Sequence, residues 1–191
     1  MDRIVSSEQE PLILVDEDDR EIGSLDKAAC HDGAGVLHRA FSLFIFNPAG
    51  ELLLQQRSAA KRLWPVYWSN SCCSHPRLGE TMQEATSRRL REELDLEAEL
   101  EFVYKFSYHA RFDASGSERE LCWVFLGRTA EEALPNAHEI ADLRWFPADR
   151  LQAILERDQQ EFTPWFRLEW EALVKEHAAR LQKYQPAVSV K

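Results

Sequence analysis

The chain has 191 residues, 45% of them hydrophobic and 29% charged. This composition suits one compact domain over residues 1–191, with flexible tails at about 1–10 and 186–191. The formal charge of −10 argues against nucleic acid or an anionic membrane as the main partner.

In chain order, the first predicted elements are strands. Leu12–Val15 forms a short strand, and Phe41–Phe46 and Glu51–Gln56 form an antiparallel hairpin, because the turn sequence Asn-Pro-Ala-Gly lies between them. From Glu80 to Leu94, apolar residues recur at helical spacing among many charges. This segment predicts an amphipathic helix capped by Thr81.

Further strands are expected over residues 102–108, 120–126 and 143–146, followed by a helix after Pro147. Thr163 and Pro164 predict the start of a last helix that runs toward Tyr184. Strands before and after a central helix imply an α/β (α+β) sandwich.

The first ten residues lack the pattern of a signal peptide, and the longest apolar stretches are far too short to span a bilayer. We therefore expect a cytoplasmic protein. The four cysteines show no spacing typical of secreted disulfides. Their thiols are candidates for core residues, metal ligands or catalysts.

Positive charge is concentrated in the middle of this acidic chain. Between Lys27 and Arg91 there are nine Lys or Arg and four Asp or Glu, so this segment carries +5 and the remainder −15. Most such residues serve solubility, but they can also form charge-assisted hydrogen bonds with a phosphate. The expected partner is a small anion, with no obligate protein partner evident, and the candidate anion binders are Lys27, Arg57, Lys61 and Arg88.

The segment from Trp64 to Pro76 is the most informative for chemistry. Cys73 stands two residues before His75 and close to several tryptophans. A thiol in this setting can act as an acid, a base or a nucleophile beside a metal ligand. The alternative is a packed aromatic loop with inert thiols, since free cysteine is often simply buried.

A second motif resembles a degenerate Nudix box, G-x5-E-x7-R-E-U-x-E-E-x-G-U, in which U is a bulky aliphatic residue. The box positions that match are Glu80, Arg88, Leu90, Glu92, Glu93 and Leu96. The positions that depart from it are Ser74 and Asp95, in place of glycines, and Arg89, in place of a glutamate. A solvated helix face with alternating charges is the alternative explanation.

The substitution at Arg89 bears on the reaction. Nudix hydrolases generally need several box carboxylates to gather metals and activate a water, and Arg89 removes one carboxylate while adding a positive charge. Hydrolysis is therefore disfavoured. Glu93 can still hold one Mg²⁺ against a diphosphate.

Histidines and a Glu-x-Glu pair suggest a second metal site. His31 and His38 are seven residues apart, and Glu118 and Glu120 point to one face of a predicted strand. With His75 they offer three nitrogens and several oxygens, a set that suits Mn²⁺ or Zn²⁺ better than Mg²⁺. The alternative for each residue alone is an ordinary solvated or hydrogen-bonded side chain.

From about Leu12 to Trp165, the order and approximate spacing of these motifs resemble the type 1 isopentenyl diphosphate isomerases of the Nudix superfamily. The sequence Cys-Cys-Ser-His-Pro is typical of that family. The resemblance implies a Nudix-type α/β/α sandwich with a mixed sheet. It also implies an enzyme of isoprenoid biosynthesis that interconverts isopentenyl and dimethylallyl diphosphate, with Mg²⁺ and either Mn²⁺ or Zn²⁺ as cofactors.

The resemblance further implies roles for individual residues. Cys73 matches the catalytic thiol, Tyr108 a tyrosine that assists proton transfer, and Trp165 a tryptophan that faces the reacting carbon. The implied ligands of Mn²⁺ or Zn²⁺ are His31, His38, His75, Glu118 and Glu120. The implied diphosphate site comprises Mg²⁺ on Glu93 together with Lys27, Arg57, Lys61 and Arg88 or Arg89.

Moving the double bond requires a proton added at C4 and one removed at C2, by groups on opposite faces of the alkene. Glu120 with Tyr108 would deliver one proton, and Cys73 would take the other as a thiolate. Trp165 and Trp68 would stabilise the cation through their rings. Two other functions stay open: a Nudix pyrophosphohydrolase, which releases phosphate, and a Nudix-like binding module, which tolerates loss of Cys73.

Overall fold

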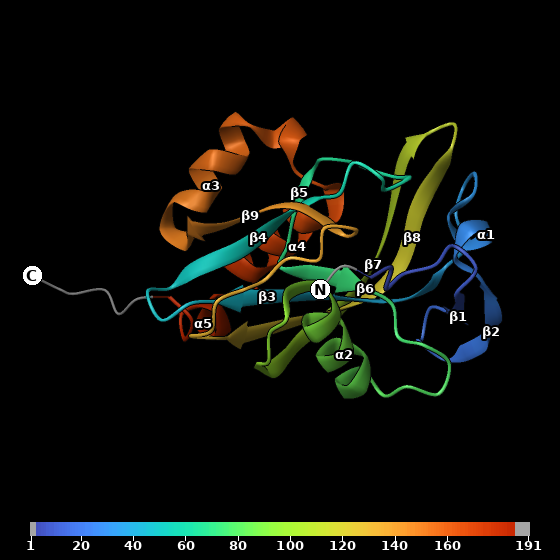
Figure 1. Cartoon of the computed structure of the whole chain (residues 1–191), viewed down its shortest axis with the longest axis horizontal. Helices are drawn as coiled ribbons and strands as arrows, with labels where there is room; N and C mark the ends of the chain where they lie inside the picture. Colours follow the sequence, from blue (N-terminus) through green and yellow to red (C-terminus); the bar gives the residue numbers. More distant parts are fainter. Residues whose placement is uncertain (1–2, 186–191) are drawn as a thin grey trace, which may run out of the picture.

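The computed structural model describes residues 3–185 and folds them around one mixed sheet of nine strands (Figure 1). The main strand order is β2-β1-β3-β4-β5; β6 and β8 pair with β3, β7 pairs with β8, and β9 pairs with β4. The elements are β1 Pro11–Val15, β2 Glu21–Asp26, α1 Lys27–His31, β3 His38–Phe46, β4 Glu51–Arg57, β5 Trp68–Ser69, β6 Cys72–Ser74, α2 Met82–Leu94, β7 Glu99–Asp113, β8 Gly116–Arg128, β9 Ile140–Pro147, α3 Ala148–Arg157, the 3-10 helix η1 Gln159–Glu161, α4 Pro164–Lys175 and α5 Ala178–Leu181.

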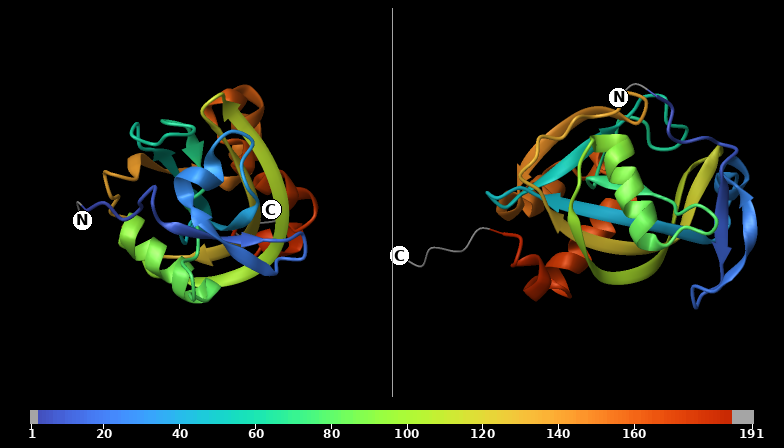
Figure 2. Two further views of the ribbon diagram at one scale, coloured as in Figure 1. Left: turned by 90° about the vertical axis from the view of Figure 1, so that its right-hand side faces the viewer. Right: turned by 60° about the horizontal axis from the view of Figure 1, so that its bottom comes forward.

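Strand β3 lies at the centre of the molecule and is buried on both faces. Its side chains alternate between two hydrophobic clusters, as the period of two in a strand requires. Phe41 and Leu43 pack in one cluster with Leu90 of α2, and Phe44 packs in the other with Trp170 of α4. Helix α2 therefore covers one face of the sheet and α3 and α4 the other (Figure 2), which confirms the predicted sandwich with a mixed sheet.

Three strand pairings bring distant chemical groups together. The parallel pairing of β3 with β8 places His38 opposite Glu120, and the β7–β8 hairpin places Tyr108 opposite Glu120. The antiparallel pairing of β6 with β3 places Cys73 opposite Ser42. Because directly paired residues share a face of the sheet, these groups all lie on the face that α4 covers.

Helix α2 confirms the predicted helix and its cap. The Thr81 hydroxyl accepts from the Glu84 amide at 3.2 Å, and the Glu84 carboxylate accepts from the Thr81 amide at 2.8 Å, which forms a capping box. The helix ends at Asp95, whose φ of 52° lies in the left-handed region. The Nudix box has glycine at this position, and aspartate is one of the few residues that also tolerate this conformation.

Other predicted elements differ from the structure. The hairpin exists only at its turn, where Phe46 pairs with Leu52, because β3 continues along β6 and β8 whereas β4 continues along β5 and β9. The last helix stops at Lys175, and α5 follows after a break. The sequence does not predict β2, α1, β5 or β6, since segments of two to six residues carry too little periodicity.

The segment 3–10, expected as a tail, makes defined contacts. The Val5 carbonyl accepts from Arg89 Nη1 at 2.9 Å, and the Ser6 hydroxyl accepts from Lys27 Nζ at 2.7 Å. The expected tail at 186–191 lies outside the described residues. Within residues 3–185, each helix is too short or too polar to cross a membrane.

Candidate active site

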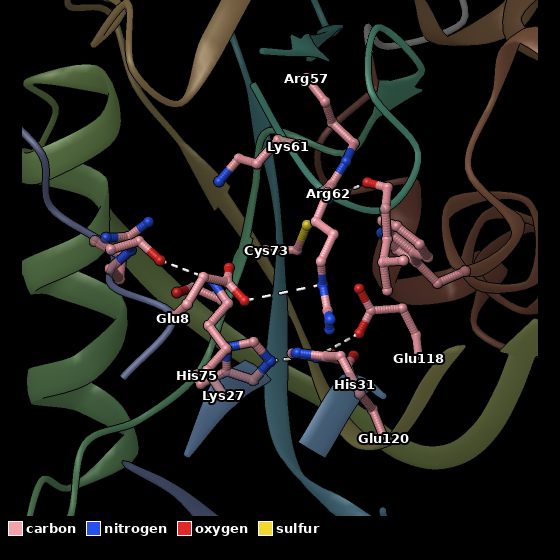
Figure 3. Close-up of a pocket in the computed structure, with 15 residues that line it drawn as sticks. Glu8, Lys27, His31, Arg57, Lys61, Arg62, Cys73, His75, Glu118 and Glu120 are labelled. Atoms are coloured by element: carbon pink, nitrogen blue, oxygen red, sulfur yellow. Dashed lines mark hydrogen bonds and ion pairs between the residues drawn. The ribbon is translucent and has the colours of Figure 1, made fainter. Parts of the chain in front are cut away.

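A cavity of about 70 Å³ is bounded by α1, β6, β8 and the start of α4 (Figure 3). Additional walls come from the N-terminal segment and from the loop after β4. The predicted site residues that line this cavity are Lys27, His31, Arg57, Lys61, Cys73, His75, Arg89, Glu118, Glu120 and Trp165.

The five predicted ligands of Mn²⁺ or Zn²⁺ lie together. One nitrogen or oxygen atom from each of His31, His38, His75 and Glu120 lies within 4.8 Å of the others. His75 Nε2 is 3.2 Å from His38 Nε2 and 3.1 Å from Glu120 Oε1. Glu118 adjoins this cluster, with Oε2 2.7 Å from His31 Nε2. Four buried or half-buried donors at such distances can hold one cation.

Hydrogen bonding around the cluster fits a metal ion. His38 Nδ1 lies 2.7 Å from the Val36 carbonyl oxygen, which only accepts, so Nε2 turns a lone pair toward the cluster. Among the described residues, neither His31 Nε2 nor Glu118 Oε2 has an aligned hydrogen-bond partner, although both are buried. The two atoms lie 2.7 Å apart, and a divalent cation would give each of them a well-oriented partner.

The pKa shifts of His75 and Glu120 suit metal binding, whereas the Glu118 carboxylate raises the pKa of His31 against the effect of burial. Burial lowers the pKa of His75 to about 3, against the opposing effect of its hydrogen bond with Glu120. Burial by itself would raise the pKa of Glu120, but its contacts with the His38 and His75 rings outweigh this effect and hold that pKa well below its usual range. Neutral imidazoles and ionised carboxylates are the forms that bind metal.

Gly116 sets how closely α1 approaches β8. A methyl group at this position would lie far too close to the backbone carbonyl oxygen of His31, so the approach requires a residue without a side chain. We expect Gly116→Ala to displace His31 and to lower the affinity for Mn²⁺ or Zn²⁺ by about tenfold or more, measured by calorimetry. The exposed Ser115→Ala is the control, and equal affinities in the two variants would contradict this prediction.

Cys73 lies on β6 and faces the cavity, whereas Cys72 points to the opposite face and packs with α2. Burial raises the pKa of the Cys73 thiol to about 12, and the nearby Arg57 cation only partly offsets this. The thiol therefore keeps its proton at neutral pH. The sequence suggested a thiolate, whereas the raised pKa favours the thiol form of this half-buried residue.

One aromatic side chain contacts Glu120 and another lines the cavity. The Tyr108 hydroxyl donates to Glu120 Oε2 at 2.7 Å, and burial raises the pKa of Tyr108 well above its usual value, so the hydroxyl keeps its proton. Trp165 lines the cavity, with the Arg57 guanidinium 5.2 Å from its ring centroid. The structure thus places one aromatic residue on the carboxylate and the other on the cavity wall.

Four predicted anion binders form the cationic part of the wall, namely Lys27, Arg57, Lys61 and Arg89. The Glu139 carboxylate pairs with Lys61 and lies 3.5 Å from Arg89 Nη2. Burial, followed by the nearby Lys61 charge, lowers the pKa of Lys27. Lys27 donates to the Ser6 hydroxyl and Arg57 to backbone carbonyls, so their positive charges can also pair with an anion.

Two predicted residues lie away from the cavity. Trp68 packs edge-on against Phe146, with ring centroids 5.5 Å apart, and Arg144 lies over its ring. Trp68 is therefore a core residue rather than part of the cavity wall. Arg88 pairs with Glu80 at 2.6 Å and does not line the cavity.

Glu93, the predicted Mg²⁺ ligand, is buried behind the cavity wall and pairs with Arg89. Gln55 Nε2 lies 3.4 Å from its other carboxylate oxygen. The arginine that replaces a box glutamate thus neutralises the neighbouring glutamate and itself lines the cavity. Of the two arginines considered as diphosphate binders, Arg89 is the one that this geometry favours.

Comparison with known proteins agrees with the site. The NUDIX domain family matches residues 36–166. The protein named Isopentenyl-diphosphate Delta-isomerase 1 of Photorhabdus laumondii is 39% identical over 174 residues, which cover 90% of this chain and 99% of that protein. The Isopentenyl-diphosphate Delta-isomerase of Halorhodospira halophila is 40% identical over 160 residues, which cover 83% and 91%. The chain belongs to the isopentenyl-diphosphate Delta-isomerase family.

Solved structures place this isomerase-family chain in the Nudix fold. DR0079 from Deinococcus radiodurans superposes with a TM-score of 0.64 at 24% identity, over 78% of this chain and 90% of that one. The MutT protein from Methanosarcina mazei superposes with a TM-score of 0.61 at 18% identity, over 74% and 95%. At this level of identity the likeness concerns the fold alone.

Sequence reasoning about this isomerase-family chain missed Arg62 as a site residue. Its side chain lines the cavity, pairs with Asp32 and donates to the Ala28 carbonyl at 3.1 Å. The one signal in the sequence was its position directly after Lys61, a predicted anion binder. Glu139 was also missed, because an isolated glutamate in an acidic chain shows no sign of pairing with distant cations.

The sequence also offered no indication of Glu169, a buried acid. Glu169 lies one helical turn after Trp165 on α4 and is completely buried. Cys122 Sγ lies 3.4 Å from Glu169 Oε1, while Oε2 has no partner within the described chain. Burial raises the pKa of Glu169 to about 8, so this carboxyl is mostly neutral at physiological pH.

We expect Glu169→Gln to remove part of the pH dependence of stability. Its pKa is raised from 4.5 to about 8, so its contribution is fully present below the unfolded value and is lost as the pH rises through about 8. The slope is about 1 kcal/mol per pH unit between these values. Urea unfolding with a chelator, at about pH 5 and about pH 8, should show the wild type losing more stability than the variant. Equal losses would show that Glu169 does not titrate in this range.

Proposed function

We propose that this chain interconverts isopentenyl diphosphate and dimethylallyl diphosphate in isoprenoid biosynthesis, by protonating the alkene at one carbon and deprotonating it at another. The observation that carries the proposal is that the Cys73 thiol and the Tyr108–Glu120 pair adjoin one cavity with a cationic wall. The names of the sequence relatives support the substrate. Four free thiols suit a cytoplasmic location.

The reaction requires one proton donor and one proton acceptor. The pKa of the Cys73 thiol is raised and that of the Glu120 carboxylate is lowered, so the two groups are suited to supply one proton donor and one proton acceptor. Their roles exchange in the reverse direction. The Tyr108 hydroxyl, hydrogen-bonded to Glu120, can pass a proton between that carboxylate and the substrate.

The carbocation-like state between the two proton transfers must be protected from water. Trp165 is the candidate for this role, because an indole face stabilises a desolvated cation by about 2 kcal/mol. Trp165 and Cys73 both line the cavity, so the indole and the thiol border the same space.

We assign Mn²⁺ or Zn²⁺ to the histidine and glutamate cluster, because imidazole and carboxylate ligands in this ratio suit these ions. Such an ion, when bound, withdraws electron density from Glu120 and fixes the imidazole rings. Glu93 is assigned to Mg²⁺ on the diphosphate, which requires its ion pair with Arg89 to open. The diphosphate then serves as a handle that orients the alkene, held by Lys27, Arg57, Lys61 and Arg89.

The test is an assay of the purified protein with isopentenyl diphosphate, Mg²⁺ and either Mn²⁺ or Zn²⁺, in D₂O. Dimethylallyl diphosphate carrying one new deuterium, without release of phosphate, is the expected result. Unchanged substrate would overturn the proposal. Phosphate release would instead favour the hydrolase function, which the pairing of Arg89 with Glu93 opposes.

A further inference from the structure

Ser69 of β5 lies at the centre of a buried polar cluster that joins two parts of the proposed site. Its hydroxyl oxygen is 2.8 Å from Asn70 Oδ1, 3.0 Å from Thr163 Oγ1 and 3.0 Å from Trp165 Nε1. The Cys73 sulfur lies 3.9 Å away. One hydroxyl group therefore contacts both the tryptophan and the thiol.

The hydrogen bonding of this hydroxyl is saturated. Asn70 Oδ1 only accepts, so it takes the single Ser69 proton, and the Trp165 indole N–H only donates, so it fills one Ser69 lone pair. Thr163 then donates into the second lone pair. With one donor and two acceptors in use, the hydroxyl has one orientation and fixes its partners relative to one another.

Thr163 and the backbone make further contacts between the start of α4 and the segment from β5 to β6. Thr163 occupies the N-cap position of α4, but its side chain makes no capping hydrogen bond, although threonine often caps helices. Its hydroxyl contacts Ser69 instead, and its amide donates to the Trp68 carbonyl at 2.9 Å. On the other side, Asn70 Nδ2 donates to the Cys72 carbonyl at 3.1 Å. Hydrogen bonds thus connect the start of α4 to the segment that carries Cys73.

We propose that Ser69 is a positioning residue for the isomerase reaction, because its hydroxyl holds the Trp165 indole while its partner Asn70 holds the segment that carries Cys73. This inference rests on the proposed function, in which the thiol moves a proton and the indole stabilises the cation. A displacement of about 1 Å can cost about a hundredfold in rate. Within the described chain, Ser69 contacts none of the cations of the cavity wall, so its loss should lower kcat rather than raise KM.

The test compares Ser69→Ala with Ser71→Ala, a matched control. Ser71 is also fully buried, and its hydroxyl donates to the Leu53 carbonyl at 2.6 Å and accepts from the Ile45 amide at 2.8 Å, away from the cavity. Both substitutions should reduce thermal stability. Ser69→Ala should also lower kcat per folded molecule about tenfold to a hundredfold, with KM changed less than about threefold. Ser71→Ala should leave both constants near the wild-type values.

A double-mutant cycle shows whether Ser69 acts through the indole. Trp165→Phe keeps an aromatic ring but removes the N–H group, so Ser69→Ala should lower kcat less than about threefold in that background. Ser69→Thr, which retains the hydroxyl, should restore most of the wild-type kcat. An equal effect of Ser69→Ala in both backgrounds would overturn the coupling to Trp165.

The outcomes separate this inference from the proposed function. A wild type that isomerises nothing overturns both. An active wild type in which Ser69→Ala behaves like Ser71→Ala overturns the role of Ser69 alone. An active wild type with a kcat loss confined to Ser69→Ala, and diminished in Trp165→Phe, supports the inference.

Discussion

Replacing Cys73 with alanine should lower the isomerisation rate about 10²-fold to 10⁴-fold, the usual contribution of a positioned acid or base. Its sulfur faces the cavity and carries a proton at neutral pH, and alanine at this position cannot exchange one. The methyl group retains the strand geometry of β6, so the loss should fall on kcat. The measurement is the initial rate of dimethylallyl diphosphate formation at saturating substrate and metal.

Cys72→Ala is the matched control for this prediction. Cys72 is the adjacent residue on the same strand and is completely buried, but it packs against α2 on the opposite face of the sheet. This variant should lose some stability and keep its rate, because it removes packing and an interaction with Glu93 but leaves the Cys73 thiol in place. If Cys73→Ala retained the rate of Cys72→Ala, the thiol would have no role in proton transfer.

The sequence predicts those parts of the fold in which local preference and tertiary structure agree. Helix α2 is an example, because Thr81 and the helical spacing of apolar residues specify the same element. The β3–β4 hairpin is a counterexample, since its turn is local but the partners of each strand lie far away in the chain. Strand pairing depends on contacts between distant segments, which a local pattern does not contain.

In the candidate site, too, some features follow from local sequence and others depend on contacts between distant segments. The Glu118 and Glu120 pair is predictable, because residues two apart in a strand share a face, and both line the cavity. Trp68 stands only five residues before Cys73, but its strand turns it into the core against Phe146. The pairing of Arg89 with Glu93 follows from helical spacing. That this pair is buried, however, depends on the packing of α2.

Replacement of Glu120 with glutamine should separate metal binding from proton transfer. The Glu120 carboxylate contacts His75 at 3.1 Å through one oxygen and the Tyr108 hydroxyl at 2.7 Å through the other. An amide retains an oxygen that can face a cation but cannot accept a proton at neutral pH. We expect metal affinity to fall about tenfold or more, and the rate at saturating metal to stay about 10²-fold to 10⁴-fold below the wild type.

The persistence of that loss at saturating metal is the decisive observation. If excess Mn²⁺ or Zn²⁺ restored the rate of Glu120→Gln, then Glu120 would act only as a ligand, and the proton would have to pass through another group. Tyr108→Phe provides the comparison, because it removes the hydroxyl that donates to Glu120 and leaves the carboxylate in place. It should lower the rate by a smaller factor, about tenfold, with little change in metal affinity. A carboxylate that both holds the cation and exchanges the proton requires the larger loss in Glu120→Gln, whereas a pure ligand does not.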